Sequence, residues 1–347
     1  MKPSMTPMER VLTTLRYAEP DRVPFFLLLT MHGARELQVP LSQYLRVPEM
    51  VAEGQLRLRE KYGHDCLVAA PYAAADVEAW GGEVLFRDDG PPNAGEAFIS
   101  DVEEIRRLDV PEMSTDPVLA ATLRVIELLA ARSQDVPIIG GVVAPFSLPI
   151  MQLGFERYLL LMEERPDLFE RLMALNAEYC VQVANAQLAA GATAIGFADP
   201  MSSSTIVSPQ VYRDVASRIA ARTLARIHGG VALNVASGRC LQIIGELSQT
   251  GAVAVQVGPD EDLGDLKRAA AGSVALLGNL NGLTMRRWSA EVAEAEVKKA
   301  LAAAGPGGGF VLADGHGEIP FQVPDEALHA VADAARRWGK YPLDWVE

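Results

Sequence analysis

Short, uninterrupted apolar runs alternate with amphipathic segments along most of the chain. Eight runs have the length of a strand and begin near residues 23, 66, 137, 193, 231, 252, 274 and 309. Runs that are apolar at every position are typical of strands buried on both faces, as in a parallel sheet covered by helices. Apolar residues at helical spacing follow most of these runs, at residues 49–62, 116–132, 149–164, 166–190, 208–228, 240–250, 262–271, 289–304 and 325–338. This alternation predicts a (β/α)8 barrel.

Two segments lie outside the alternation. Residues 5–17 have helical spacing behind Thr6, with Glu9 three residues later, which is the pattern of a capped amino-terminal helix. Residues 77–115 are rich in turn-forming residues and contain only short β-like pieces. So long a segment without a strong helix indicates an insertion after the second strand that contains a hairpin. This insertion could cover the barrel mouth. Its expected β-like pieces are residues 83–86 and 97–99.

Length and composition narrow the class of protein. A single barrel domain covering residues 1–347 fits the length, and 49% apolar with 22% charged residues is close to the globular average. A formal net charge of −14 without a basic block disfavours binding to nucleic acid or anionic lipid. No signal sequence or membrane-spanning apolar stretch is visible, and the three cysteines are widely spaced. We therefore expect a cytoplasmic protein without structural disulfides.

Polar residues follow the apolar runs where a barrel would carry its ligand site. In barrels of this class the side chains just past the carboxyl ends of the strands line the site. This inventory is rich in amides and poor in Lys and Arg, which favours an uncharged or heterocyclic ligand over a phosphate. The candidate ligand-binding residues are Met31, Arg35, Tyr72, Asp76, Gln256, Asn279, Asn281 and Asp314, and the candidate catalytic residues are His316, Asp199 and Asn234.

Asp199 and His316 are the candidates for proton transfer. The apolar run before Asp199 should desolvate its carboxyl and raise its pKa, although Asp199 could instead cap the polar loop that follows. His316 stands between two glycines after the last strand and could be a base, a metal ligand or a solvated turn residue. Since the fourth and eighth strands lie on opposite sides of the ring, we expect these two side chains to face one another across the mouth. Asn234 and Asn279 would orient the reacting atom.

Five short motifs suggest a family. In order they are Asp21-Arg22-Val23-Pro24, Tyr62-Gly63-x-Asp65, Ala198-Asp199-Pro200, Gly278-Asn279-Leu280 and Gly315-His316-Gly317. Their order and spacing resemble the uroporphyrinogen decarboxylase superfamily along essentially the whole chain, most of all its cobamide-dependent methyltransferases, which act on methylated corrinoid proteins. The resemblance implies a (β/α)8 barrel whose funnel admits a porphyrinogen or the corrin of a partner protein. It also implies a homodimer.

The chain departs from both branches of this family at known positions. The zinc-dependent methyltransferases carry His-x-Cys after the fifth strand and a later Cys, whereas this chain has Asn234, Ala236 and His316. We therefore do not expect a tightly bound zinc. The decarboxylases carry Arg-Gln-Ala-Gly-Arg after the first strand, and the segment 31–35 retains only Arg35. The chain therefore lacks part of the positive charge that would bind a polyanionic porphyrinogen for decarboxylation. The His316 loop and Asp76 nevertheless match the decarboxylases.

The sequence leaves three functions open. The first is a corrinoid-dependent methyltransferase that moves a methyl group between a small methylated compound or acceptor and the cobamide of a partner protein. The second is a decarboxylase or related lyase acting on a porphyrinogen-like acid. The third is a non-catalytic homologue that binds a tetrapyrrole.

Overall fold

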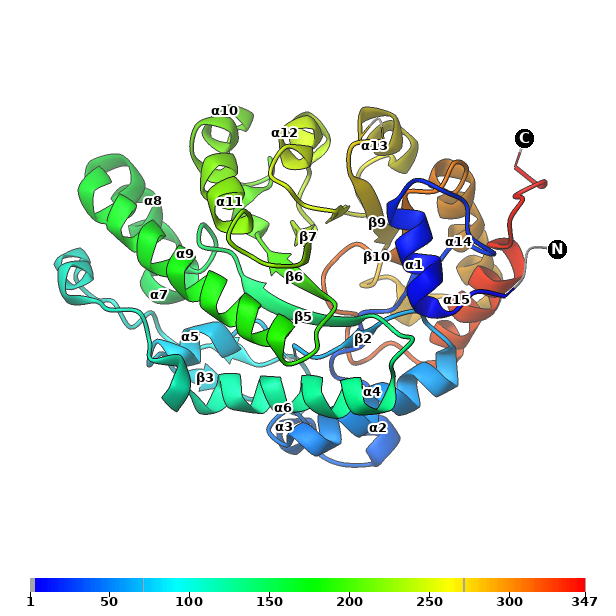
Figure 1. Cartoon of the computed structure of the whole chain (residues 1–347), viewed down its shortest axis with the longest axis horizontal. Coiled ribbons are helices and arrows are strands. Elements are labelled where there is room, and N and C mark those ends of the chain that lie inside the picture. Colours follow the sequence, from blue (N-terminus) through cyan, green and yellow to red (C-terminus); the bar gives the residue numbers. More distant parts are fainter. Residues whose placement is uncertain (1–3, 71, 271, 347) are drawn as a thin grey trace.

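Eight parallel strands form one sheet in a computed structural model that describes residues 4–70, 72–270 and 272–346. The strand order is β1-β10-β9-β8-β7-β6-β5-β2, and helices surround the sheet (Figure 1). The predicted (β/α)8 architecture and its eight strands are confirmed. The strands are β1 (Phe25–Phe26), β2 (Leu67–Val68), β5 (Ile138–Val143), β6 (Ala194–Ala198), β7 (Gly230–Asn234), β8 (Ala254–Gln256), β9 (Ala275–Leu280) and β10 (Phe310–Asp314).

The helices follow the predicted ranges closely. The predicted helix 149–164 is two helices, because the chain turns at Gly154 with φ 82°. The end predicted at Ala271 lies outside the described residues. In the described part of the chain, no helix is both long and apolar enough to cross a membrane. The helices are α1 (Pro7–Leu15), α2 (Gly33–Leu37), α3 (Leu41–Tyr44), α4 (Pro48–Tyr62), α5 (Ala75–Ala79), α6 (Pro117–Arg132), α7 (Pro149–Leu153), α8 (Phe155–Glu164), α9 (Pro166–Ala189), α10 (Pro209–Val211), α11 (Ser217–Leu224), α12 (Ile244–Ser248), α13 (Leu263–Ala270), α14 (Ala290–Ala304) and α15 (Asp325–Trp338).

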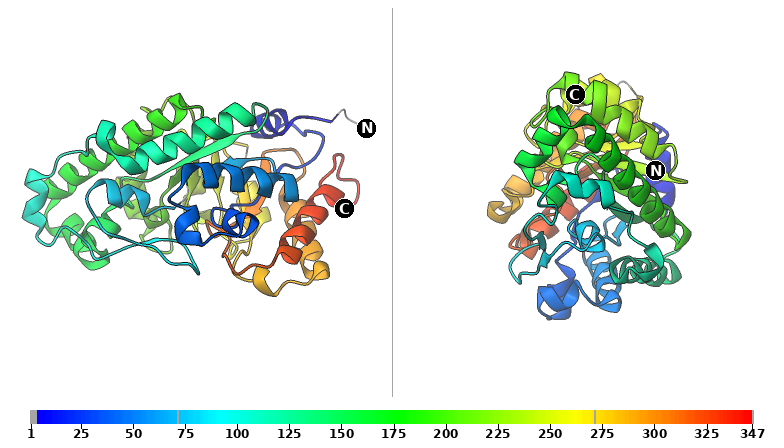
Figure 2. Two further views of the ribbon diagram at one scale, coloured as in Figure 1. Left: turned by 90° about the horizontal axis from the view of Figure 1, so that it is seen from below. Right: turned by 90° about the vertical axis from the view of Figure 1, so that its left-hand side faces the viewer.

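The insertion after β2 contains a two-stranded antiparallel hairpin of β3 (Val84–Leu85) and β4 (Asn93–Ala94). The first predicted piece, 83–86, is confirmed, but the second, 97–99, is wrong. Ile99 is apolar because it is buried against the helix layer, where its N–H donates to the carbonyl of Gln152 at 2.9 Å. The segment after the hairpin and helix α8 project at the end of the molecule opposite both termini (Figures 1 and 2).

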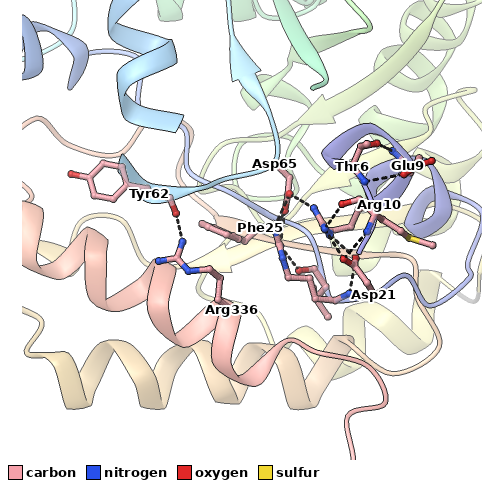
Figure 3. Close-up of polar contacts among 11 residues, drawn as sticks. Thr6, Glu9, Arg10, Asp21, Phe25, Tyr62, Asp65 and Arg336 are labelled. Carbon is pink, nitrogen blue, oxygen red and sulfur yellow. Dashed lines mark hydrogen bonds and ion pairs between the residues drawn. The ribbon is translucent and has the colours of Figure 1, made fainter. Parts of the chain in front are cut away.

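Asp65 joins the two ends of the sheet at the floor of the barrel. Strands β1 and β2 are not ladder partners, but the Asp65 N–H donates to the Phe25 carbonyl and the Phe25 N–H donates to the Asp65 carboxylate, both at 2.9 Å (Figure 3). Arg10 of α1 and Arg22 each reach the same carboxylate at 2.7 Å. The ion pairs thus hold the amino-terminal helix against the closed ring.

Small residues leave the upper half of the barrel hollow. Gly141, Gly196 and Ala232 are neighbours in register on β5, β6 and β7. Barrel interiors are usually filled by layers of Val, Ile and Leu side chains, so three neighbouring positions with almost no side chain leave this side of the interior unfilled. The space remains open toward the carboxyl ends of the strands. Below it, the lower interior is packed by Phe26, Cys66, Val68, Val311 and Ala313.

Candidate functional site

A cavity of about 710 Å³ occupies this hollow. Phe26, Val68 and Leu277 form part of its floor, since they also belong to or pack against the apolar cluster below. Residues 89–91 of the hairpin insertion lie along the cavity, as the insertion was predicted to do. The volume is within the usual range of small-molecule sites, roughly 300–1,000 Å³.

His316 stands at the rim of the cavity between two other loops. Its Nδ1 lies against the Ser237 hydroxyl, and its Nε2 is 3.1 Å from Oδ1 of Asn281. Ser237 follows β7, Asn281 follows β9 and His316 follows β10. The loops after three strands therefore meet at the imidazole ring of His316. Partial burial lowers the pKa of His316, and Asp260 offsets part of that decrease. The ring is therefore neutral at pH 7.

Glu318 lies two residues beyond His316 and also lines the cavity. The hydroxyl of Thr30, at the exit of β1, donates to its carboxylate at 2.8 Å. Burial raises the pKa of Glu318, and the bond from Thr30 lowers it only in part. A carboxyl with a raised pKa beside a neutral imidazole can hold a proton at the cavity rim.

The barrel wall opens between β2 and β5. The two strands pair at Leu67 with Ile138 and at Val68 with Ile139, and two further bonds join the Leu67 N–H to the Pro137 carbonyl and the Ala69 N–H to the Ile139 carbonyl. Above that point side chains replace the missing strand partner. The Gln187 amide accepts from the Gly141 N–H and donates to its carbonyl, both at 2.8 Å. Asp76 accepts from the Val143 N–H at 2.5 Å.

Through this opening the cavity continues toward helices α6 and α9. Asp76 also accepts from the Tyr179 hydroxyl at 2.9 Å, and burial raises the pKa of Asp76 to about 7. Asp116 caps α6 by accepting from the N–H groups of Val118 and Leu119 at 2.8 and 3.2 Å. We call this extension the side chamber and define it by Tyr72, Asp76, Asp116, Thr122, Tyr179 and Gln187.

Asp199 does not face His316 across the mouth, contrary to the prediction. Gly196 and Ala198 face the cavity, so the strand's alternation points Asp199 toward the helices. There its carboxylate accepts from the hydroxyls of Ser147 and Ser202 at 2.6 and 2.5 Å. Burial raises its pKa to about 6, in the predicted direction.

The other candidates divide into two groups. Those that line the cavity are Met31, Tyr72, Asp76, Asn234, Gln256 and His316. The Asn234 side-chain oxygen accepts from the Ala236 N–H at 2.6 Å, and the Gln256 amide donates to the Asp314 carbonyl at 2.8 Å. Five of these six candidates are polar, and they make up about a third of the described polar residues that line the cavity.

The remaining candidates lie outside the lining and hold loops. Arg35 donates to the Val323 carbonyl at 2.8 Å and lies 5.1 Å from the Phe321 ring centroid, so its charge is turned toward the carboxyl-terminal loop. The Asn279 amide donates to the carbonyls of residues 258 and 261, both at 3.2 Å. Asn281 contacts the cavity only through His316.

Asp314 is also outside the lining and is fully buried. Its Oδ1 accepts a long bond from the Leu28 N–H at 3.4 Å, and no described residue donates to its Oδ2. Burial raises the pKa of Asp314 to about 7.

The residues at the zinc positions of the related methyltransferases do not fit a thiolate zinc site. Asn234 uses its oxygen for the Ala236 N–H, and His316 lies against a hydroxyl. Cys240, the thiol in this loop, is fully buried outside the lining, and burial raises its pKa. In residues 4–70, 72–270 and 272–346, no three His, Cys, Asp or Glu side chains gather as metal ligands.

Several lining residues were missed by the sequence analysis. Glu318 lies two residues after His316, in the same Gly-rich stretch. That position after the last strand could have indicated that Glu318 lines the site. Tyr179, Val183 and Gln187 recur every four residues on α9 and all line the cavity. Tyr179 and Gln187, together with Asn176, are polar residues on the buried and mainly apolar stripe of this helix, and they could have indicated this wall.

Comparison with known proteins identifies the family. A uroporphyrinogen decarboxylase of Xylella fastidiosa is 27% identical and covers 95% of this chain and 98% of its own length. The methylcobamide:CoM methyltransferase MtaA of Methanosarcina barkeri is 28% identical over 62% of this chain and 63% of its own. A solved methyltransferase structure from Methanosarcina mazei has the same fold, with a TM-score of 0.85, 23% identity and coverage of 96% and 99%. The family model named uroporphyrinogen decarboxylase (URO-D) matches residues 6–338, and the chain belongs to this family.

Proposed function

We propose that this protein is a methyltransferase that moves a methyl group between a small methylated compound and a corrinoid carried by a partner protein. Both decarboxylases and methylcobamide methyltransferases occur among its relatives, so the choice depends on the cavity. The cavity carries the carboxyls of Asp76, Asp89, Asp116 and Glu318. No Lys or Arg is present among the described residues that line it.

This charge distribution is the observation that carries the proposal. A porphyrinogen with several carboxylates would enter a desolvated site that offers carboxyls and, among the described lining residues, no Lys or Arg to pair with its charges, and burying unpaired charges is costly. Arg35, the one residue retained from the propionate-binding segment of the decarboxylases, donates to the Val323 carbonyl, lies over the Phe321 ring and is not a lining residue. A small neutral or cationic methyl compound brings no negative charge into the site.

The rim residues would manage the proton. The corrinoid, when bound, supplies the cobalt that takes or gives the methyl group. When the bond between the methyl carbon and the heteroatom of a neutral compound breaks, the heteroatom keeps the electron pair and must gain a proton, and the reverse transfer releases one. A cationic heteroatom leaves neutral and needs no proton. His316 and Glu318 both line the cavity on one short loop, so either can hold the proton that a neutral compound needs. Asn234 would orient the heteroatom, and Asp199 would position Asn234 through its N–H, which donates to the Asn234 carbonyl at 2.7 Å.

Absorbance tests the proposal directly. The protein is mixed with free or protein-bound methylcobamide and candidate acceptors, and separately with cob(I)alamin and candidate methyl donors. We expect interconversion of the cob(I)alamin and methylcobalamin spectra at a rate that depends on the protein. A silent spectrum in both directions, together with loss of carboxyl groups from a supplied porphyrinogen, would establish the decarboxylase instead.

A further inference from the structure

The side chamber contains a buried carboxylate without a counter-ion. Asp116 is only 8% exposed, and both hydrogen bonds that it accepts go to Oδ1. No described Arg or Lys forms an ion pair with Asp116 or with Asp76 behind it. Asp65, the buried carboxylate at the barrel floor, is by contrast paired with Arg10 and Arg22. Asp199 and Asp314 are also buried without such a partner, but they lie outside the lining, whereas Asp116 and Asp76 line the cavity, where a ligand can supply the counter-charge.

Two aromatic rings, those of Tyr72 and Tyr179, line the side chamber together with Asp116. Burial raises the pKa values of Tyr72, Asp76 and Tyr179, and the charge of Asp116 adds to the increase in all three. The Tyr72 ring is held edge-on by Phe86 at 5.4 Å.

The Tyr179 ring is held in turn by Trp80, with centroids 5.6 Å apart. Arg46 is outside the lining and lies over the Phe86 ring at 4.0 Å.

Carboxylate and aromatic faces together are the groups that recognise alkylammonium ions. The ring faces attract a cation without hydrogen-bond donors, and the carboxylate supplies the opposite charge in a desolvated space. Val118, Leu119 and Val183 add apolar contacts suited to methyl groups. A neutral ligand would leave the Asp116 charge unpaired, and an anion would be repelled.

We infer that the side chamber binds the alkylammonium group of a cationic substrate, between Asp116 and the rings of Tyr72 and Tyr179. The rest of the substrate then extends through the opening between β2 and β5 toward His316. This inference rests on the proposed function for the identity of the bound molecule as the substrate. The site itself is defined by the chamber and can be tested without a corrinoid.

Calorimetry with three probes of similar size tests the inference on the intact protein. Choline is the cation, 3,3-dimethylbutan-1-ol its uncharged isostere, and 2-mercaptoethanesulfonate the anion. We expect choline to bind at one site per chain at least tenfold more tightly than the isostere, and the sulfonate to bind most weakly. Equal affinity for choline and the isostere, or tightest binding of the sulfonate, would overturn the inference.

Asp116→Asn provides the decisive variant, because Asn is as good a helix cap as Asp and removes only the charge. The variant should lose at least tenfold in choline affinity and bind the isostere unchanged. The matched control is Asp101→Asn, which changes the cap of an exposed 3-10 helix and should leave choline affinity as it is. Choline binding that Asp116→Asn does not weaken would remove Asp116 from the site.

The two proposals fail in different ways. Choline binding with no corrinoid turnover would reject the methyltransferase and keep the cation site. Corrinoid turnover of an uncharged methyl compound, without choline binding, would reject the cation site and keep the methyltransferase.

Discussion

The Gln187 side chain forms both hydrogen bonds of the Gly141 peptide groups, each at 2.8 Å, where a neighbouring strand would normally do so. Gln187→Leu keeps a similar volume but leaves a buried N–H and carbonyl without partners. Each such group costs about 1–3 kcal/mol, so we expect the free energy of unfolding to fall by about 2–5 kcal/mol. Denaturant titration measures this loss.

Gln182→Leu is the control on the same helix. Its amide is exposed and bonds only Glu178, so the free energy of unfolding should change by no more than about 0.5 kcal/mol. Equal effects of the two substitutions would mean that the bonds between Gln187 and Gly141 do not support the wall at β5.

The Asp65 ion pairs support a second stability prediction. Asp65→Asn keeps the size of the side chain but leaves the buried guanidinium of Arg10 without its full counter-charge. Breaking a buried pair in this way costs about 3–5 kcal/mol. Asp333→Asn, which breaks an exposed pair with Arg336, should cost less than about 1 kcal/mol. Denaturation curves that shift equally for both variants would contradict the role of Asp65 in closing the ring.

The barrel could be predicted because its determinants are local. Apolar runs such as residues 193–198 and amphipathic stretches such as 289–304 record burial directly in the sequence, and their order defines the architecture. The strand 97–99 was a wrong prediction for the same reason. Ile99 is apolar because it packs beneath α7, and burial alone does not distinguish a strand from an irregular segment.

The site was harder to predict because it depends on register and on contacts between distant segments. Asp199 follows its strand as predicted. Because successive side chains of a strand point to opposite faces, a shift of one residue decides whether Asp199 faces the cavity or the helices. The side chamber depends on Gln187 and Asp76 filling the place of a strand partner, and no local pattern records where two strands cease to pair. Arg35 and Asn279 resemble ligand-binding residues in sequence and hold loops in the structure.

The raised pKa of Asp314 leads us to expect that the free energy of unfolding depends on pH. Burial raises its pKa from 3.8 to about 7, so the folded state holds a proton that the unfolded state releases between these values. The protonated carboxyl stabilises the fold below pH 4, and this contribution is lost as the pH rises through 7. Asp314→Asn cannot lose a proton. Relative to the natural protein, the variant should therefore gain stability between pH 4 and 8, by an amount on the order of 3 kcal/mol.

Urea unfolding of both proteins at several pH values measures this difference. Asp325→Asn is the control: although burial acts in the opposite direction, Lys61 and Tyr62 lower the pKa of Asp325 below 3.8, so its stability difference from the natural protein should stay constant from pH 4 to 8. A difference between natural protein and Asp314→Asn that stays constant from pH 4 to 8 would show that Asp314 is ionised in the folded state throughout.

His316→Gln tests the rim of the cavity. Glutamine can still bond Ser237 and Asn281 but cannot exchange a proton near pH 7, so the loop should keep its structure while proton transfer is lost. Turnover in the corrinoid assay should fall by about 10² to 10⁴, the usual contribution of one general acid or base. His228→Gln, on the exposed surface, should leave turnover unchanged. If His316→Gln unfolds the protein while each folded molecule keeps full activity, His316 is a structural residue and proton transfer must be assigned elsewhere on the rim, with Glu318 the next group to replace.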